Sequence, residues 1–209
     1  MNSITNWIKS HKIASGGCGC LVVILFLAIA IGGWMKASYN EMVKLDEGVS
    51  TAWSNVQSQY QRRADLIPNL VNTVKGYAAH EKETLEGVIA ARSKATQMTI
   101  DSSNLTEENM KKFQQAQGEL SNALGKLLMV QERYPELKAN ENFSELQAQL
   151  EGTENRIAVE RNNFNKVVEE YNLKVRSFPN NILAGMFGFE KKSKFEAEAG
   201  SEKAPEVKF

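Results

Sequence analysis

The sequence predicts an all-α protein in which an N-terminal transmembrane helix is followed by a long antiparallel four-helix bundle. Two patterns carry this prediction: an uncharged run at residues 13–35, and apolar residues that recur three or four positions apart over most of the remaining chain. The first pattern is typical of a membrane span and the second of amphipathic helices that bury one face. We therefore expect a short tail at 1–12, a transmembrane helix at 13–36, the bundle at 37–178 and a membrane-proximal tail at 179–209.

The uncharged run is long enough to cross a bilayer. As a helix it rises about 35 Å, compared with about 30 Å for a hydrocarbon core, so a slightly tilted span fits. The membrane-spanning residues that we predict are Leu21, Val22, Val23, Ile24, Leu25, Phe26, Leu27, Ile29, Ile31 and Trp34. A cleaved signal peptide is the alternative, but no small-x-small cleavage site follows the apolar stretch. The run is therefore interpreted as a retained anchor.

Neither the flanks nor the cysteines of the span identify the side of the membrane on which the bundle lies. Two lysines precede the span and two follow it closely, so the positive-inside rule gives a tie. Cys18 and Cys20, the only cysteines of the chain, sit at the edge of the span and cannot form a disulfide within the bundle. Whether either thiol carries a lipid stays open.

The first two bundle helices are predicted to meet at a turn at residues 61–66. An apolar stripe with helical spacing predicts one helix over 39–62. Asp65 can cap a second helix with Pro68 in its first turn, where the missing N–H is harmless. That second helix is expected to fade near Ala95.

A loop and two further helices complete the predicted bundle. Residues 97–105 lose the helical period and carry turn formers, so they are interpreted as a loop. Thr106 is the predicted cap of the third helix, which Pro135 ends. The fourth helix is expected to start at a cap on Asn142, with Asn140 as the alternative, and to run to the next proline.

The order of these helices predicts which loops lie near the membrane. Four antiparallel helices of this length form a bundle about 40 Å long. The turn at 61–66 and the loop at 134–141 should then lie at the far tip. The loop at 97–105 and the chain after residue 178 should return to the membrane.

Two candidate binding surfaces follow from this tracing. The far tip would combine charge with an aromatic side chain, as protein interfaces do; its residues are Arg62, Arg63, Tyr134, Glu136 and Lys138. The C-terminal tail would present apolar and basic side chains to an anionic leaflet; its residues are Ile182, Leu183, Met186, Phe187, Phe189, Lys191 and Lys192. A solvated end cap is the alternative for the first, and packing against the bundle for the second.

Polar residues interrupt the apolar stripe of the fourth helix. They are Glu154, Asn155, Arg161, Asn165 and Asn172. They could form a buried polar layer that sets helix register or binds a partner, or they could face water. Asn165 and Asn172 are seven residues apart and therefore occupy nearly the same heptad position.

Nothing in the sequence indicates a catalytic or metal site. His11 and His80 are not part of the Glu-x-x-His pairs that di-metal bundles use, and His80 is expected on the surface. Gly-x-Ser-x-Gly, Walker-type and His-Glu-x-x-His motifs are absent. We therefore expect no enzyme activity and no cofactor. Because 25 basic residues balance 25 acidic ones, we also expect no nucleic-acid partner.

Five segments in order carry a resemblance to a known family. They are residues 39–49, 61–71, 134–143, 152–157 and 178–189, the last reading Phe178-Pro-Asn-Asn-Ile-Leu-Ala-Gly-Met-Phe-Gly-Phe189. On these segments the chain resembles the LemA family of bacterial membrane proteins. The resemblance implies a single span in the bacterial inner membrane followed by a four-helix bundle, with the short N-terminus outside and the bundle in the cytoplasm. It implies an architecture and not a biochemical role.

The function predicted from these observations is that of a membrane-anchored helical scaffold or adaptor. Its expected partners are the lipid bilayer and a protein, and self-association as a homo-oligomer is left open. A membrane-anchored small-molecule sensor that binds ligands between its helices is the alternative. A sensor of the usual receptor kind would need a second span or an output domain, and the sequence shows neither.

Overall fold

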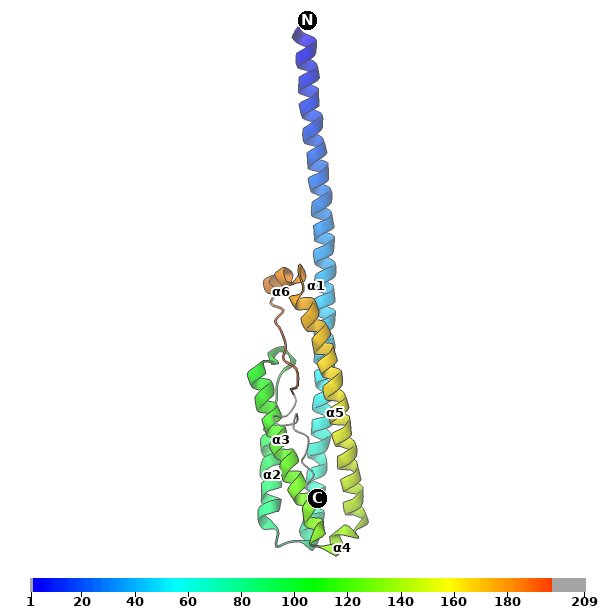
Figure 1. Cartoon of the computed structure of the whole chain (residues 1–209), viewed down its shortest axis with the longest axis vertical. Helices are drawn as coiled ribbons and strands as arrows, with labels where there is room; N and C mark the ends of the chain where they lie inside the picture. Colours follow the sequence, from blue (N-terminus) through cyan, green and yellow to red (C-terminus); the bar gives the residue numbers. More distant parts are fainter. Residues whose placement is uncertain (1, 197–209) are drawn as a thin grey trace, which may run out of the picture.

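A computed structural model describes residues 2–196 of the chain, and the side chains of residues 21–196. The described part contains helices and loops but no strand, which confirms the all-α prediction. Figure 1 shows one very long helix, α1 (Asn2–Tyr77), whose N-terminal half projects alone and whose C-terminal half packs with the other helices. The side chains of Cys18 and Cys20, and the part of the predicted tail after residue 196, lie outside the described residues.

The projecting half of α1 contains the candidate membrane span. All the predicted membrane-spanning residues are exposed, from 39 % for Trp34 to 75 % for Phe26. The most apolar window of the helix has a mean hydropathy of 2.1, high enough to cross a membrane. Each large apolar side chain gains about 1.5–3 kcal/mol on leaving water, so lipid is the solvent that this surface requires.

The helix α1 does not turn at residues 61–66, and the sequence prediction of a helix end there is wrong. The helix continues through Pro68, which has no N–H to offer the Ala64 carbonyl four residues earlier. Arg92, on helix α2 (Lys82–Gln97), donates its Nε–H to that carbonyl at 2.8 Å. A proline inside α1 is therefore tolerated because a neighbouring helix supplies the missing donor.

The chain turns after Tyr77 instead, and α2 then runs back toward the membrane end. Its 16 residues rise about 24 Å. The loop that follows contains a short turn, η1 (Ser102–Asn104), and contacts α1 where the Ile100 carbonyl accepts from Trp53 Nε1 at 2.8 Å. The loop predicted at 97–105 is confirmed, but its return to the membrane is wrong, because α2 is too short to reach it.

The next helix is α3 (Glu107–Met129). It starts at the predicted cap, Thr106, whose Oγ1 accepts from the Asn109 N–H at 3.3 Å. Two short helical turns, η2 (Val130–Glu132) and α4 (Pro135–Lys138), close the far end of the bundle. The predicted position of this second connection at the far tip is therefore confirmed.

The helix α5 (Glu141–Arg176) runs antiparallel to α1 from the far end back to the base of the span (Figure 1). Its cap is Asn140, whose Oδ1 accepts from the Phe143 N–H at 2.9 Å. The first choice of cap, Asn142, lies inside the first turn and is wrong. The long helices α1, α2, α3 and α5 together form the predicted bundle with shifted boundaries.

The chain after α5 packs with the same bundle. The short helix α6 (Asn180–Phe187) ends at Gly188, whose φ of 77° is a conformation that glycine adopts without strain. The chain then turns back along the bundle, and Phe195 joins the core cluster around Trp53. The core therefore extends past the predicted boundary at residue 178.

The core has two parts along α1. The part nearer the membrane includes α1 residues from Met42 to Tyr60, and the far part includes those from Ile67 to Val74, followed by Ala78 in the turn after α1. Arg63 lies between them in sequence. A buried cation therefore sits at the junction of two apolar clusters.

Candidate functional site

The residues predicted as a partner surface at the far tip do not lie together. Arg62 and Arg63 sit about 20 Å along α1 from its far end. Tyr134 does lie at the far end, and Glu136 and Lys138 are exposed on α4 beside it. The predicted surface is split because the prediction assumed a turn at residues 61–66, through which α1 continues as a helix.

Arg63 is a structural residue and not a surface one. Its guanidinium donates to Gln117 Oε1 at 2.7 Å and to Ser121 Oγ at 2.8 Å on α3, and to Glu154 Oε1 at 2.6 Å on α5. Only 1 % of the residue is exposed. One cation thereby links three helices, and Glu154, whose side chain is 44 % exposed, is a polar residue of the fourth helix that pairs with it.

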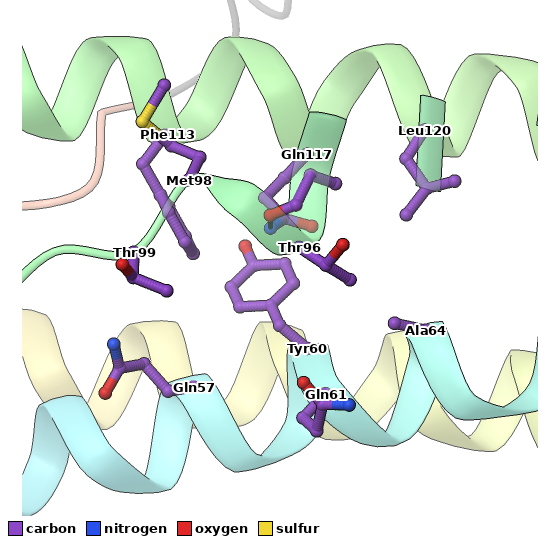
Figure 2. Close-up of a pocket in the computed structure, with 11 residues that line it drawn as sticks. Gln57, Tyr60, Gln61, Ala64, Thr96, Met98, Thr99, Phe113, Gln117 and Leu120 are labelled. Carbon is purple, nitrogen blue, oxygen red and sulfur yellow. Dashed lines mark hydrogen bonds between the residues drawn. The ribbon is translucent and has the colours of Figure 1, made fainter. Parts of the chain in front are cut away.

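The cavity beside this network is small. Figure 2 shows Tyr60 of α1 pointing toward Gln117 and Phe113 of α3, with Met98 and Thr99 nearby. The cavity holds about 80 Å³, which is space for two or three waters at about 30 Å³ each. Pockets for small ligands usually measure about 300–1,000 Å³. This cavity is therefore too small for a small-molecule ligand, whereas wider clefts of about 500, 660 and 690 Å³ lie open at the surface of the bundle.

Two asparagines on α5 hold the backbone of the C-terminal segment, which we define as residues 189–196. Asn172 donates its Nδ2–H to the Lys192 carbonyl at 2.8 Å and accepts from the Lys192 N–H at 2.9 Å. Asn165 makes the same pair of hydrogen bonds with Phe195, at 3.0 and 2.8 Å. Each carboxamide thus satisfies both backbone groups of one residue, as a neighbouring β-strand would.

The spacing of the two asparagines matches an extended chain. Seven residues of helix rise about 10.5 Å, and three residues of extended chain cover about 10 Å. Asparagines one heptad apart can therefore reach every third residue of an antiparallel extended segment. The heptad spacing of Asn165 and Asn172 was visible in the sequence, but their ligand, which lies 20 to 30 residues further along the chain, carried no local signal.

The aromatic side chain of the C-terminal segment fills a site on the bundle. Phe195 is 6 % exposed, and its ring centroid lies 5.9 Å from that of Trp53 and 5.4 Å from that of Phe164. The Arg161 guanidinium lies 4.8 Å from the Phe195 centroid, close enough for a cation–π contact. Sequence reasoning did not identify Phe195 as part of any site.

Two of the three lysines of the segment pair with carboxylates. Lys192 Nζ pairs with Asp46 of α1 at 2.5 Å, and Lys194 Nζ pairs with Glu169 of α5 at 2.7 Å. The hydrogen bond from Lys194 lowers the pKa of the Glu169 carboxyl. Only 9 % of Lys192 is exposed, so its predicted contact with lipid is wrong, because its backbone is held by Asn172 and its cation is paired inside the bundle.

Tyr171 of α5 lies next to this segment, with the Lys192 ammonium 5.2 Å from its ring centroid. Burial, together with the negative charges of Asp46 and Glu190, raises the pKa of Tyr171 to about 12. An unfolded tyrosine titrates near pH 10. The stability that comes from this group is therefore fully present below about pH 10 and is lost as the pH rises toward about 12.

We expect Tyr171→Phe to weaken the loss of stability in alkali. Between pH 9 and pH 11 the wild-type chain should lose about 1 kcal/mol more of its free energy of unfolding than the variant does. Urea unfolding of the full chain at a series of pH values measures this difference. Tyr77→Phe, at a tyrosine that is 42 % exposed, is the control and should follow the wild type. Identical pH profiles for both variants would contradict the prediction.

The helix α6 packs on α1 directly after the membrane span. Ser38 Oγ donates to Asn180 Oδ1 at 2.6 Å. The ring centroid of Tyr39 lies 4.9 Å from that of Phe187 and 5.7 Å from that of Phe189. These contacts set the height of α6 relative to the span.

The other side of α6 is apolar and exposed, and we call it the α6 patch. It consists of Phe178 (81 % exposed), Ile182 (56 %) and Met186 (67 %). Phe187 is 49 % exposed and lies at the edge of the patch, because its ring also packs on Tyr39. Leu183, also predicted to contact the membrane, is buried against the bundle at 3 %. Lys191 is exposed beside the patch and Phe189 is half-buried. The predicted tail surface is therefore divided into a buried part and an exposed part, because one face of α6 packs on the bundle and the other faces away from it.

Titratable side chains form no cluster suited to chemistry in the described part of the chain. No group of three or more histidine, cysteine, aspartate or glutamate side chains could hold a metal ion there. His80 is exposed at the far turn, as the sequence predicted. The features that the structure does bring together are the asparagine-held C-terminal segment and the α6 patch.

Comparison with known proteins gives consistent matches. A family model described as the LemA family matches residues 52–209, which include Asn165, Asn172 and the C-terminal segment. Magnetosome protein MamQ 2 of Paramagnetospirillum magneticum is 27 % identical over 204 residues, covering 89 % of this chain and 75 % of that protein. Protein LemA of Metamycoplasma hominis is 24 % identical over 164 residues, covering 77 % and 71 %. Magnetosome protein MamQ of Magnetospirillum gryphiswaldense is 27 % identical over 198 residues, covering 86 % and 73 %.

Proposed function

Because the chain belongs to the LemA family, we propose that it is a non-enzymatic, membrane-anchored scaffold that rests on the bilayer through α6 and presents its bundle to a protein partner. One continuous helix, α1, is both the span and a central helix of the bundle. Any tilt of the span is therefore passed directly to the bundle. We place this scaffold in the bacterial inner membrane, with the bundle in the cytoplasm.

The position of the α6 patch is the observation that carries this proposal. The uncharged run ends at Met35, and α6 is held by Ser38 and Tyr39. Four residues of helix rise about 6 Å. Interfacial helices bury their apolar face about 5–10 Å into the boundary between headgroups and acyl chains. This distance supports our proposal that the α6 patch contacts the lipid headgroups.

The charges around the α6 patch suit an anionic leaflet. Lys36, Arg176 and Lys191 are all exposed near the base of the bundle. Each basic side chain near an anionic surface contributes about 1 kcal/mol of attraction. The cytoplasmic leaflet has a negative surface potential, and this supports our proposal that the bundle is cytoplasmic.

A spin label at the α6 patch is expected to report lipid contact. We would replace Ile182 with cysteine in a full chain carrying Cys18→Ser and Cys20→Ser, and reconstitute it in vesicles that contain anionic lipid. The label should collide more often with molecular oxygen, which dissolves in lipid, than with a water-soluble nickel relaxant. Relaxant-dependent EPR saturation measures both collision rates.

The matched control places the same label at Met129, which is 64 % exposed at the far end of α3. Because about 60 Å of helix separates the base of the span from the far end of the bundle, that label should favour the nickel relaxant. If the labels at Ile182 and Met129 were equally accessible to nickel, the proposed contact between α6 and the bilayer would be wrong.

A further inference from the structure

The C-terminal segment is held in the way that proteins hold extended peptides. Asn165 and Asn172 contact only its backbone, so this part of the binding does not depend on the bound sequence. Phe195, Lys192 and Lys194 occupy side-chain sites. Peptide recognition commonly divides in this way, with main-chain hydrogen bonds giving affinity and side-chain sites giving specificity.

The segment also borders open clefts on both sides. One cleft, of about 660 Å³, lies between the segment and α5 and includes Glu169 and Asn172. The other, of about 690 Å³, lies between the segment and α3 and includes Gln114 and Glu119. The segment itself is not helical. It could therefore leave its site without breaking the hydrogen bonds of any helix.

The contacts define the chemistry of a ligand for this site. Asp46 and Glu169 pair with lysines two residues apart, and the aromatic site lies one residue further along. The Gln114 side chain donates to the Glu196 carbonyl at 3.0 Å and extends the backbone contacts past the aromatic residue. The matching peptide is extended and basic, with the pattern Lys-x-Lys followed directly by an aromatic residue.

We propose that the groove between α1, α3 and α5 is a recognition site for such a segment of a partner protein, and that the C-terminal segment of the chain is its built-in competitor. The charge complementarity of Asp46 and Glu169 is what selects a basic partner over an acidic one. This inference rests on the proposed scaffold role, because it names the class of partner. Its test involves neither lipid nor α6, so the two proposals can fail separately.

The built-in competitor keeps the groove closed by proximity. Tethered through Gly188, the C-terminal segment has an effective concentration of the order of millimolar. A free peptide with the same contacts at micromolar concentration is at a disadvantage of about 100-fold or more. Partner binding therefore requires the cis segment to be weakened, which makes the segment a regulator of access.

The test measures binding of a fluorescent peptide with the sequence of residues 188–196 to the full chain in detergent. Phe195→Ala weakens the cis segment without changing the groove, so this variant should bind the peptide at least 10-fold more tightly than the wild type does. Phe178→Ala is the matched control, because Phe178 is 81 % exposed and lies outside the groove; it should bind as weakly as the wild type. Fluorescence anisotropy gives the dissociation constants.

Further substitutions locate the binding in the groove. In the Phe195→Ala chain, Asn165→Ala with Asn172→Ala should lower the affinity for the peptide at least 10-fold. Glu169→Lys, at an exposed surface position, should lower it several-fold without disturbing the core. If Phe195→Ala loses its helical circular dichroism, Lys194→Glu opens the groove instead, because it only reverses a charge opposite Glu169.

Three results would overturn the inference. One is no gain in peptide binding by a folded Phe195→Ala or Lys194→Glu chain. Another is binding that survives both the asparagine and the Glu169 substitutions. The third is a carbodiimide crosslink between Lys194 and Glu169 of different copies of the wild-type chain, which would assign the groove to a second copy and not to a partner.

Discussion

Replacing Trp53 with alanine is expected to lower the free energy of unfolding by about 3–5 kcal/mol, the range for a large buried aromatic side chain. Trp53 is 1 % exposed, and its ring centroid lies 5.3, 5.4 and 5.9 Å from those of Phe113, Phe164 and Phe195. Its indole N–H donates to the Ile100 carbonyl. The substitution therefore removes the side chain at which α1, α3, α5 and the C-terminal segment meet.

Urea unfolding of the full chain in detergent, followed by circular dichroism, measures this loss. Trp53→Phe keeps a ring and removes one of the two donors to the Ile100 carbonyl, while Gln57 Nε2 still donates to it at 3.1 Å. This variant should therefore cost only about 1–2 kcal/mol. Trp34→Ala is the control, because Trp34 lies on the span and not in the core of the bundle. A Trp53→Ala chain as stable as the Trp34→Ala chain would show that the aromatic cluster does not stabilise the bundle.

The features that the sequence predicted correctly are those that depend on local patterns. The span follows from an uncharged run, and the start of α3 follows from Thr106 and the acidic residues after it. The loop at 97–105 follows from a lost period and a cluster of turn formers. Each of these signals lies within a few residues of the structure that it specifies.

The failed predictions were decided by contacts between distant parts of the chain. Asp65 and Pro68 form a reasonable start for a helix, but the Arg92 side chain from α2 makes the proline tolerable inside α1. Once that turn was misplaced, Arg63 was assigned to a tip that lies about 20 Å away. One wrong boundary therefore removed two of the five residues of the predicted partner surface.

The candidate site shows the same limit. The apolar residues that follow Pro179 in the sequence predicted an apolar surface there. The structure leaves Ile182 and Met186 exposed but buries Leu183. The inward position of Lys192 could not be predicted from the sequence of the tail. It depends on Asn172, which binds the Lys192 backbone, and on Asp46, which pairs with its ammonium group. A segment held by side chains of another helix has no periodicity of its own.

The ion pair between Arg63 and Glu154 is the second place where a large effect is expected, and the two partners should not be equivalent. The Arg63 side chain is 2 % exposed, whereas the Glu154 side chain is 44 % exposed. Removing the carboxylate leaves a buried cation without a counter-ion. Removing the cation leaves a carboxylate that water already reaches. The penalty of an unpaired buried charge therefore falls on one variant only.

We expect Glu154→Ala to cost about 3 kcal/mol, at the low end of the range for breaking a buried pair because Glu154 is partly solvated. Arg63→Met fills most of the volume with an apolar side chain and leaves only Gln117 Oε1 without a donor, so it should cost about 1 kcal/mol. Urea unfolding of both variants in detergent gives the two values, with Glu151→Ala, on the exposed side of the same helix, as the control. If Arg63→Met proved the more costly of the two, the prediction would be wrong. The hydrogen bonds from Arg63 to α3 would then stabilise the bundle by more than the penalty for burying its charge.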